Sequence, residues 1–73
     1  MNYYSKSAED GSYLRISPLT SKLSQYVISQ VDLTSKYFLY RSSPKRTGLE
    51  IEVLAAIPDD DAAFQMSLLL GLE

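Results

Sequence analysis

A chain of 73 residues without cysteine or histidine has room for one small domain and cannot use disulfides or histidine ligands to stabilise it. Its 45% hydrophobic content argues against intrinsic disorder, and its net charge of −2 excludes a global positive field that would attract nucleic acid or an anionic membrane. No apolar run approaches the ~20 residues of a membrane helix, and the first dozen residues lack the apolar centre of a secretion signal, so we expect a soluble cytoplasmic protein.

We expect residues 1–73 to form a single domain, and we give no weight to residues 72–73, because they could derive from an expression vector. The domain is expected to begin with a β-hairpin. Asp10-Gly11 is a dipeptide typical of tight hairpin turns. Leu14 and Ile16 then alternate with polar residues, as in a strand that buries one face. We therefore expect strands over 3–7 and 12–17.

The stretch from Ser17 to Val31 predicts an α-helix. Ser17 can cap it, and Pro18 stands at the first helical position, where a missing N–H is harmless. The apolar residues that follow recur at the i, i+4, i+7, i+8 spacing of one helix face. They are Leu19, Leu23, Tyr26 and Val27, with Gln30 on the same face. Ile28 falls on the far side of this helix, where the sequence offers no contact for it.

A second hairpin is predicted from a strand over 36–42, a turn over 43–48 and a strand over 49–57. Alternate residues of the last strand, from Leu49 to Ile57, are apolar and are expected on one face. The register that we expect places Phe38 opposite Val53, Tyr40 opposite Ile51 and Arg41 opposite Glu50. This register collects the four hydrophobic residues on one face and matches opposite charges on the other.

A second helix is predicted from Asp59, a good N-cap after the strand-ending Pro58, to a stop at Gly71. The fold class expected from these elements is α+β. It comprises a small antiparallel sheet of three or four strands with two helices on one face, in the order ββαββα. No motif in the chain is specific enough to name a family.

The second helix carries more apolar surface than so small a chain can cover. Its expected inner face consists of Ala62, Met66, Leu69 and Leu70. Phe64 and Leu68 lie nearly opposite, and a chain of this length buries only about 60% of its unfolded surface. Phe64, Leu68 and Ile28 are therefore the expected partner-binding residues, in a homodimer or with a hydrophobic protein partner. The alternative is a shorter helix whose last leucines fold back.

The basic and aromatic segment 36–46 suggests a different function, the binding of single-stranded nucleic acid. Its candidate contacts are Lys36, Tyr37, Arg41, Lys45 and Arg46. Aromatic stacking combined with cations is typical of such sites. The expected register leaves only Tyr37 available for stacking and pairs Arg41 with Glu50. Five acidic residues follow the basic segment in the sequence. A solvated hairpin tip is the favoured interpretation, with a protein partner or nucleic acid as alternatives.

Residues for catalysis or metal binding are few. Asp59–Asp61 are consecutive, so they cannot all point at one cation, and helix capping explains them better. The remaining catalytic candidates are Ser42 or Ser43 with Lys45, a tyrosine base, or Glu50 with Glu52. The three glycines form no phosphate loop. We therefore expect no enzyme, no cofactor and no metal. The leading hypothesis is a small non-catalytic protein-interaction or regulatory module that self-associates through the C-terminal helix.

Overall fold

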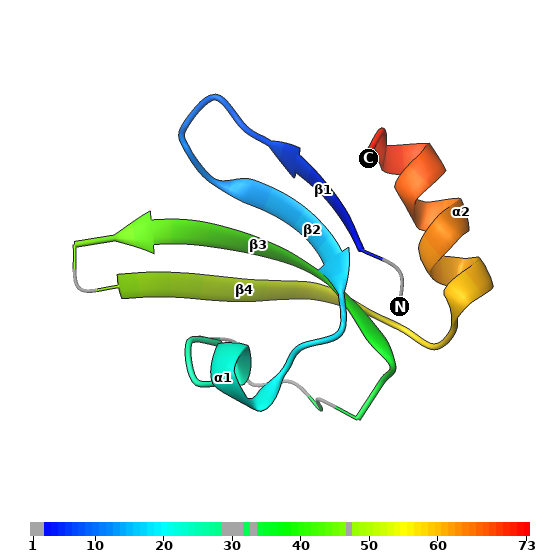
Figure 1. The fold of residues 1–73 in the computed structure, drawn as a ribbon, viewed down its shortest axis with the longest axis horizontal. Helices are drawn as coiled ribbons and strands as arrows, with labels where there is room; N and C mark the ends of the chain where they lie inside the picture. Colours follow the sequence, from blue (N-terminus) through cyan, green and yellow to red (C-terminus); the bar gives the residue numbers. More distant parts are fainter. Residues whose placement is uncertain (1–2, 29–31, 33, 47) are drawn as a thin grey trace.

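The computed structural model describes residues 3–28, 32, 34–46 and 48–73 and has the expected α+β class, built on one antiparallel sheet (Figure 1). The four strands lie in the spatial order β1-β2-β3-β4, so each strand pairs with the next one along the chain. In chain order the elements are β1 (Tyr4–Ser7), β2 (Tyr13–Ser17), α1 (Ser21–Ser24), β3 (Tyr37–Lys45), β4 (Gly48–Ile57) and α2 (Asp60–Leu70).

The two helices lie on opposite faces of the sheet, so the expectation that both cover one face is wrong. Four consecutive residues of β3, Tyr37 to Tyr40, are buried. Since successive strand residues point to opposite faces, this run needs cover on both sides. Tyr37 and Leu39 belong to the cluster formed with α2, whereas Phe38 and Tyr40 belong to the cluster formed with the segment around α1.

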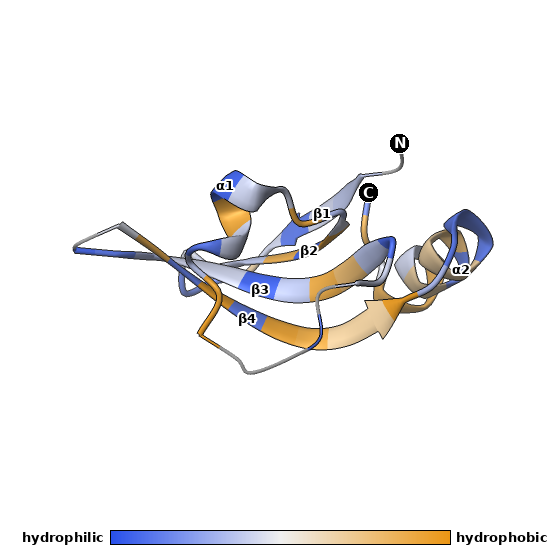
Figure 2. Ribbon diagram, turned by 90° about the horizontal axis from the view of Figure 1, so that it is seen from below, coloured by the Kyte–Doolittle hydropathy of each residue, from blue (hydrophilic) through white to orange (hydrophobic). Residues whose placement is uncertain are grey.

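The α2 side of the sheet holds the larger cluster. Its buried members are Ile16, Tyr37, Leu39, Ile57, Ala63 and Leu72. The hydrophobic parts of β3 and β4 lie at the end of the sheet nearest α2 (Figure 2). The predicted boundaries of this helix are confirmed: Asp59 accepts a hydrogen bond from the Ala62 N–H (2.8 Å), and Gly71, at φ +70°, ends the helix.

The helix predicted over 17–31 is reduced to the single turn of α1. Thr20, rather than Ser17, caps it. The chain then extends, and Ile51 of β4 pairs with it through the Tyr26 carbonyl (3.0 Å) and the Ile28 N–H (2.9 Å). Serine-rich sequence and β-branched residues favour helices weakly, which explains the early end. Val31 and Gln30 lie outside the described residues.

The apolar residues that were predicted on one helix face do share a side, and they are partly buried against the sheet. Leu19, Leu23, Tyr26 and Val27 pack against the cluster on the α1 side, around Phe38, Tyr40 and Ile51. A single helical turn followed by an extended segment therefore places the same side chains on the sheet as the longer helix was expected to place.

From Tyr40 to the turn, the hairpin of β3 and β4 has a register two residues away from the expected one, whereas Phe38, expected opposite Val53, pairs with Ala56. Tyr40 pairs with Val53, Ser42 with Ile51 and Arg41 with Glu52. A shift of two residues keeps every side chain on its face, so hydrophobic patterning does not distinguish the two registers. The strands also continue into the expected turn until Lys45 pairs with Gly48, whose φ of +139° is accessible to glycine.

A β-bulge in β4 overturns the expectation that its alternate residues share one face. The register shifts between Leu39 and Tyr40, because Ala55 pairs with Leu39 and Val53 with Tyr40, which leaves Leu54 as the additional residue. Val53 therefore packs on the α1 side, whereas Ala55 packs on the α2 side. The bulge lets one strand contribute to both clusters.

Residues 72–73, which the sequence analysis left aside, take part in the fold. Leu72 is 7% exposed and belongs to the α2-side cluster. Glu73 exchanges two backbone hydrogen bonds with Ser5 at the outer edge of β1, at 2.9 and 3.1 Å. The end of α2 is therefore tied to the sheet both by apolar packing and by main-chain hydrogen bonds.

We expect Leu72→Ala to lower the free energy of unfolding by about 2 kcal/mol or more, because it removes a buried leucine side chain. Leu69→Ala is the matched control, since Leu69 is 81% exposed and its truncation is expected to change stability by less than about 0.5 kcal/mol. Urea denaturation followed by circular dichroism, at concentrations where the chain is monomeric, measures both. Equal losses in the two variants would contradict the described packing of Leu72.

Candidate functional site

Three large apolar side chains lie exposed along α2, and we call them the outer α2 face. Phe64 is 48% exposed, Leu68 is 61% exposed and Leu69 is 81% exposed. Phe64 and Leu68 are neighbours at i, i+4 on the helix surface, and Leu69 follows directly. The exposure of Phe64 and Leu68 agrees with the two-sided apolar helix that the sequence indicated.

The inner side of α2 is formed by smaller residues than expected. Ala63 and Ser67 are buried, and Ala62, Met66 and Leu70 are partly buried against the α2-side cluster. Leu69, which was expected on this inner side, lies outside. Small side chains let the helix approach the sheet closely. Ser67 tolerates burial because its hydroxyl donates to the Phe64 carbonyl (2.6 Å), an interaction that a helical wheel does not include.

Ile28 does not lie with the outer α2 face. It is 59% exposed, but its N–H bonds to Ile51 at the edge of β4, next to Val27 on the α1 side of the sheet. The three residues predicted to bind a partner are therefore divided between two places. Phe64 and Leu68 form one surface, and Ile28 belongs to another.

Charged side chains lie at both ends of α2. At its start, the Asp60 carboxylate accepts a hydrogen bond from the Tyr37 hydroxyl (2.5 Å) and forms an ion pair with Lys36 (3.1 Å). The Tyr37 hydrogen bond, and after it Lys36, lower the pKa of Asp60, and the same carboxylate raises the pKa of Lys36. At its end, Lys6 Nζ lies 3.9 Å from where a Cβ on Gly71 would stand. The Asp60 carboxylate complements the helix dipole. At the other end Glu73 lines the same hollow as Lys6 and Gly71, so this end carries a positive and a negative side chain.

The residues proposed for nucleic-acid contact are not brought together. Lys36 and Tyr37 lie at the start of β3, whereas Lys45 and Arg46 lie at its far end, about 30 Å away at ~3.3 Å per residue. Tyr37 was the aromatic expected to be available for stacking, and it is only 1% exposed. Its burial on the α2 side follows from the two-sided cover of β3.

Arg41 does not have the partner that the sequence suggested. It stands opposite Glu52 in β4, and the Glu50 carboxylate lies 4.0 Å from Lys45 Nζ instead. Both side chains of this Lys45–Glu50 pair are about half exposed, so the pair adds little to stability. The change follows directly from the shifted register of the hairpin.

The described part of the chain gives little support for a metal site or a membrane-spanning helix. No group of three or more acidic side chains in the ranges described could hold a metal ion. None of the helices in those ranges is long and apolar enough to cross a membrane. The acidic residues at the start of α2 have structural roles. Asp59 caps the helix, and Asp60 contacts Lys36 and Tyr37.

We expect Asp60→Asn to lower the melting temperature at pH 7, with a difference from the parent that disappears in acid. A carboxylate whose pKa is lowered by folding stabilises the fold above its unfolded pKa, near 3.8, and this contribution is lost as the pH falls through the folded pKa. Asp61→Asn is the matched control, because Asp61 forms no ion pair or hydrogen bond among the described residues. Melting curves from pH 7 to pH 2.5, at concentrations where the chain is monomeric, test this, and a pH-independent difference for Asp60→Asn would contradict it.

Comparisons with known proteins give no assignment for this surface, so we interpret it from its geometry. No protein-family model matches the chain, and neither does any curated protein or solved structure. The feature that the structure offers most plainly as a candidate site is therefore the outer α2 face, with acidic residues in the first turn of the helix and Lys6 near its end.

Proposed function

We propose that the protein is a small non-catalytic interaction or regulatory module that associates with a second copy of itself through the outer α2 face. The observation that carries this proposal is the exposure of Phe64, Leu68 and Leu69 on one helix. Contiguous exposed apolar side chains on a small domain are typical of association sites. Their burial in a dimer would contribute about 25 cal/mol per Å² of apolar surface removed from water.

The charges at the two ends of α2 favour a second copy, paired antiparallel, as the occupant. A two-fold axis through the outer α2 face would place the first turn of one helix beside the last turn of the other. Asp61 would then approach Lys6 of the partner copy. A parallel arrangement would instead place the two acidic first turns side by side and the two lysines together, with repulsion at both ends.

The sheet edges are less suited to self-association than α2. The outer edge of β1 is bonded to Glu73 at Ser5, and the outer edge of β4 is bonded to Tyr26 and Ile28 at Ile51. Near the middle of each edge the main-chain groups already have partners. The edges are therefore poor templates for a further strand. This favours pairing through side chains of the helix over continuation of the sheet.

The alternative function, binding of single-stranded nucleic acid, has less support. Tyr37 is buried, and Lys36 and Lys45 each face a carboxylate. A phosphate backbone would have to displace these acids and would find no exposed aromatic among the five residues proposed for contact. We propose no catalytic role, and the cytoplasmic location stays a prediction.

The central test is the mass of the protein in solution. The parent chain is expected at about 16.4 kDa at micromolar concentration, twice the 8.2 kDa of one chain. Phe64→Asp and Leu68→Asp are each expected to give the monomer mass, because a buried unpaired carboxylate is costly in an apolar interface. Size-exclusion chromatography with light scattering measures the mass, and circular dichroism checks that each variant is folded.

Ile28→Asp is the matched control, since Ile28 is as exposed as Leu68 but lies at the β4 edge. It is expected to leave the dimer intact. A monomeric parent, or a dimer broken by Ile28→Asp and unaffected by Leu68→Asp, would contradict the proposed interface.

The antiparallel orientation has its own test in a charge exchange. Lys6→Glu and Asp61→Lys are each expected to weaken the dimer about two- to fivefold, the effect of losing an exposed ion pair and gaining repulsion. The double variant is expected to recover the parent affinity. Sedimentation equilibrium at low salt measures the dissociation constants, and additive weakening in the double variant would contradict the orientation.

A further inference from the structure

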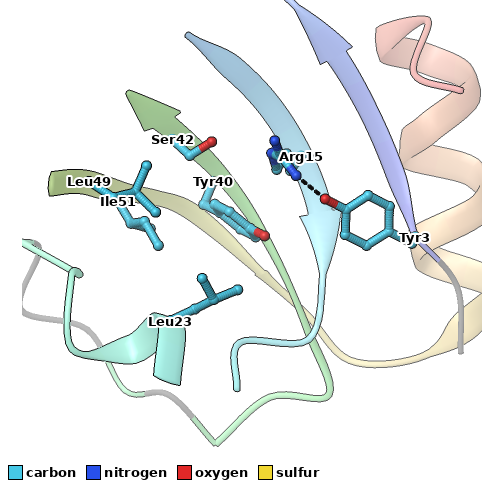
Figure 3. Close-up of a pocket in the computed structure, with 7 residues that line it drawn as sticks. All are labelled: Tyr3, Arg15, Leu23, Tyr40, Ser42, Leu49 and Ile51. Carbon is cyan, nitrogen blue, oxygen red and sulfur yellow. Dashed lines mark hydrogen bonds between the residues drawn. The ribbon is translucent and has the colours of Figure 1, made fainter. Parts of the chain in front are cut away.

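A pocket with mixed lining lies between α1 and the sheet, on the face opposite α2 (Figure 3). Its volume is about 140 Å³. This is close to the ~150 Å³ of an apolar cavity that can hold one benzene molecule. The lining residues come from β2, β3, β4, α1 and the start of the described chain, and they are Tyr3, Arg15, Leu23, Tyr40, Ser42, Leu49 and Ile51.

Arg15 stands at one wall of this pocket and lacks a carboxylate partner. One of its terminal nitrogens, Nη1, donates to the Tyr3 hydroxyl, and its guanidinium carbon lies 4.6 Å from the centre of the Tyr13 ring. Neither of the two ion pairs formed by the described residues involves it. Its Nε is buried and has no hydrogen-bond partner there. A cation with an unsatisfied buried donor is unfavourable unless an acceptor is supplied.

Ser42 adds a hydroxyl to the pocket lining on the same side of the sheet. Its residue is 5% exposed. Tyr13 pairs with Ser42, and Arg15 pairs with Tyr40, so Arg15 and Ser42 are diagonal neighbours on adjacent strands. Such neighbours are roughly 7–8 Å apart, close enough for one carboxylate to contact both side chains.

The remaining lining contributes no negative charge. The Tyr40 hydroxyl is hydrogen-bonded to Ser17 Oγ (2.8 Å), and burial raises the pKa of Tyr40, so this phenol is neutral at neutral pH. No acidic side chain is among the described residues that line the pocket. Leu23, Leu49 and Ile51 provide an apolar surface on the other side, as the view in Figure 3 shows.

We propose that this pocket binds a small organic carboxylate. The carboxylate contacts the Arg15 guanidinium and the Ser42 hydroxyl, and a short apolar body lies against the three aliphatic side chains. Nη1 is engaged by Tyr3, whereas Nε has no acceptor among the described residues. In the proposed complex the edge that carries Nε and Nη2 turns toward the pocket, and its fork of N–H groups matches a carboxylate.

The test uses the full chain, labelled with ¹⁵N, and three probes at constant ionic strength. Benzoate has the proposed chemistry, benzamide is its neutral counterpart, and inorganic phosphate is an anion without an apolar body. Amide NMR spectra are expected to show saturable shifts with benzoate, concentrated at Leu23, Ser42 and Ile51. Benzoate is expected to bind at least tenfold more tightly than benzamide and than phosphate.

Two arginine variants complete the experiment. Arg15→Gln is expected to weaken benzoate binding at least tenfold. Arg41→Gln makes the same chemical change beside Leu14 on the α2 side and is expected to alter binding less than twofold. Should Arg15→Gln fail to fold, the benzoate and benzamide comparison on the parent chain still decides the matter. Equal affinity for these two probes, tighter binding of phosphate, or shifts that do not saturate would overturn the proposal.

Discussion

The burial of β3 on both faces is the constraint on which the rest of this structure depends. Tyr37, Phe38, Leu39 and Tyr40 are consecutive and buried, and side chains of a strand alternate between faces. A sheet covered on one side only would leave two of these four side chains in water. The chain therefore needs cover on both faces, and among the described residues α2 covers one face and the short segment around α1 covers the other.

Each cover is incomplete in a way that creates a candidate surface. On the α2 side, Ala63 and Ser67 bring the helix close to the sheet, and the larger Phe64 and Leu68 are left outside. On the α1 side, one helical turn is too short to cover the whole face, and a pocket remains beside Arg15. Small domains bury a limited share of their surface, so such unfilled places are the expected cost of covering two faces.

Because of the bulge at Leu54, β4 contributes side chains to both clusters. Ile51 and Val53 lie on the α1 side, and Ala55 and Ile57 lie on the α2 side. Helix α2 follows β4 directly, and its first turn is fixed to the start of β3 through Asp60, Lys36 and Tyr37. The position of the outer α2 face is thus determined by the same strand pair that forms the centre of the sheet.

Local turn and cap preferences and hydrophobic periodicity are enough to predict the α+β class, the hairpin at Asp10-Gly11, the limits of α2 and the exposure of Phe64 and Leu68. Contacts between distant segments account for the rest: α1 is one turn, the hairpin register is shifted by two residues, and Leu69 lies outside while Leu72 is buried. A shift of two residues leaves the pattern of faces unchanged, and Tyr26 to Ile28 pair with β4 only once that strand is in place. The Arg15 pocket is likewise formed by residues far apart in the chain, so no local pattern predicts it.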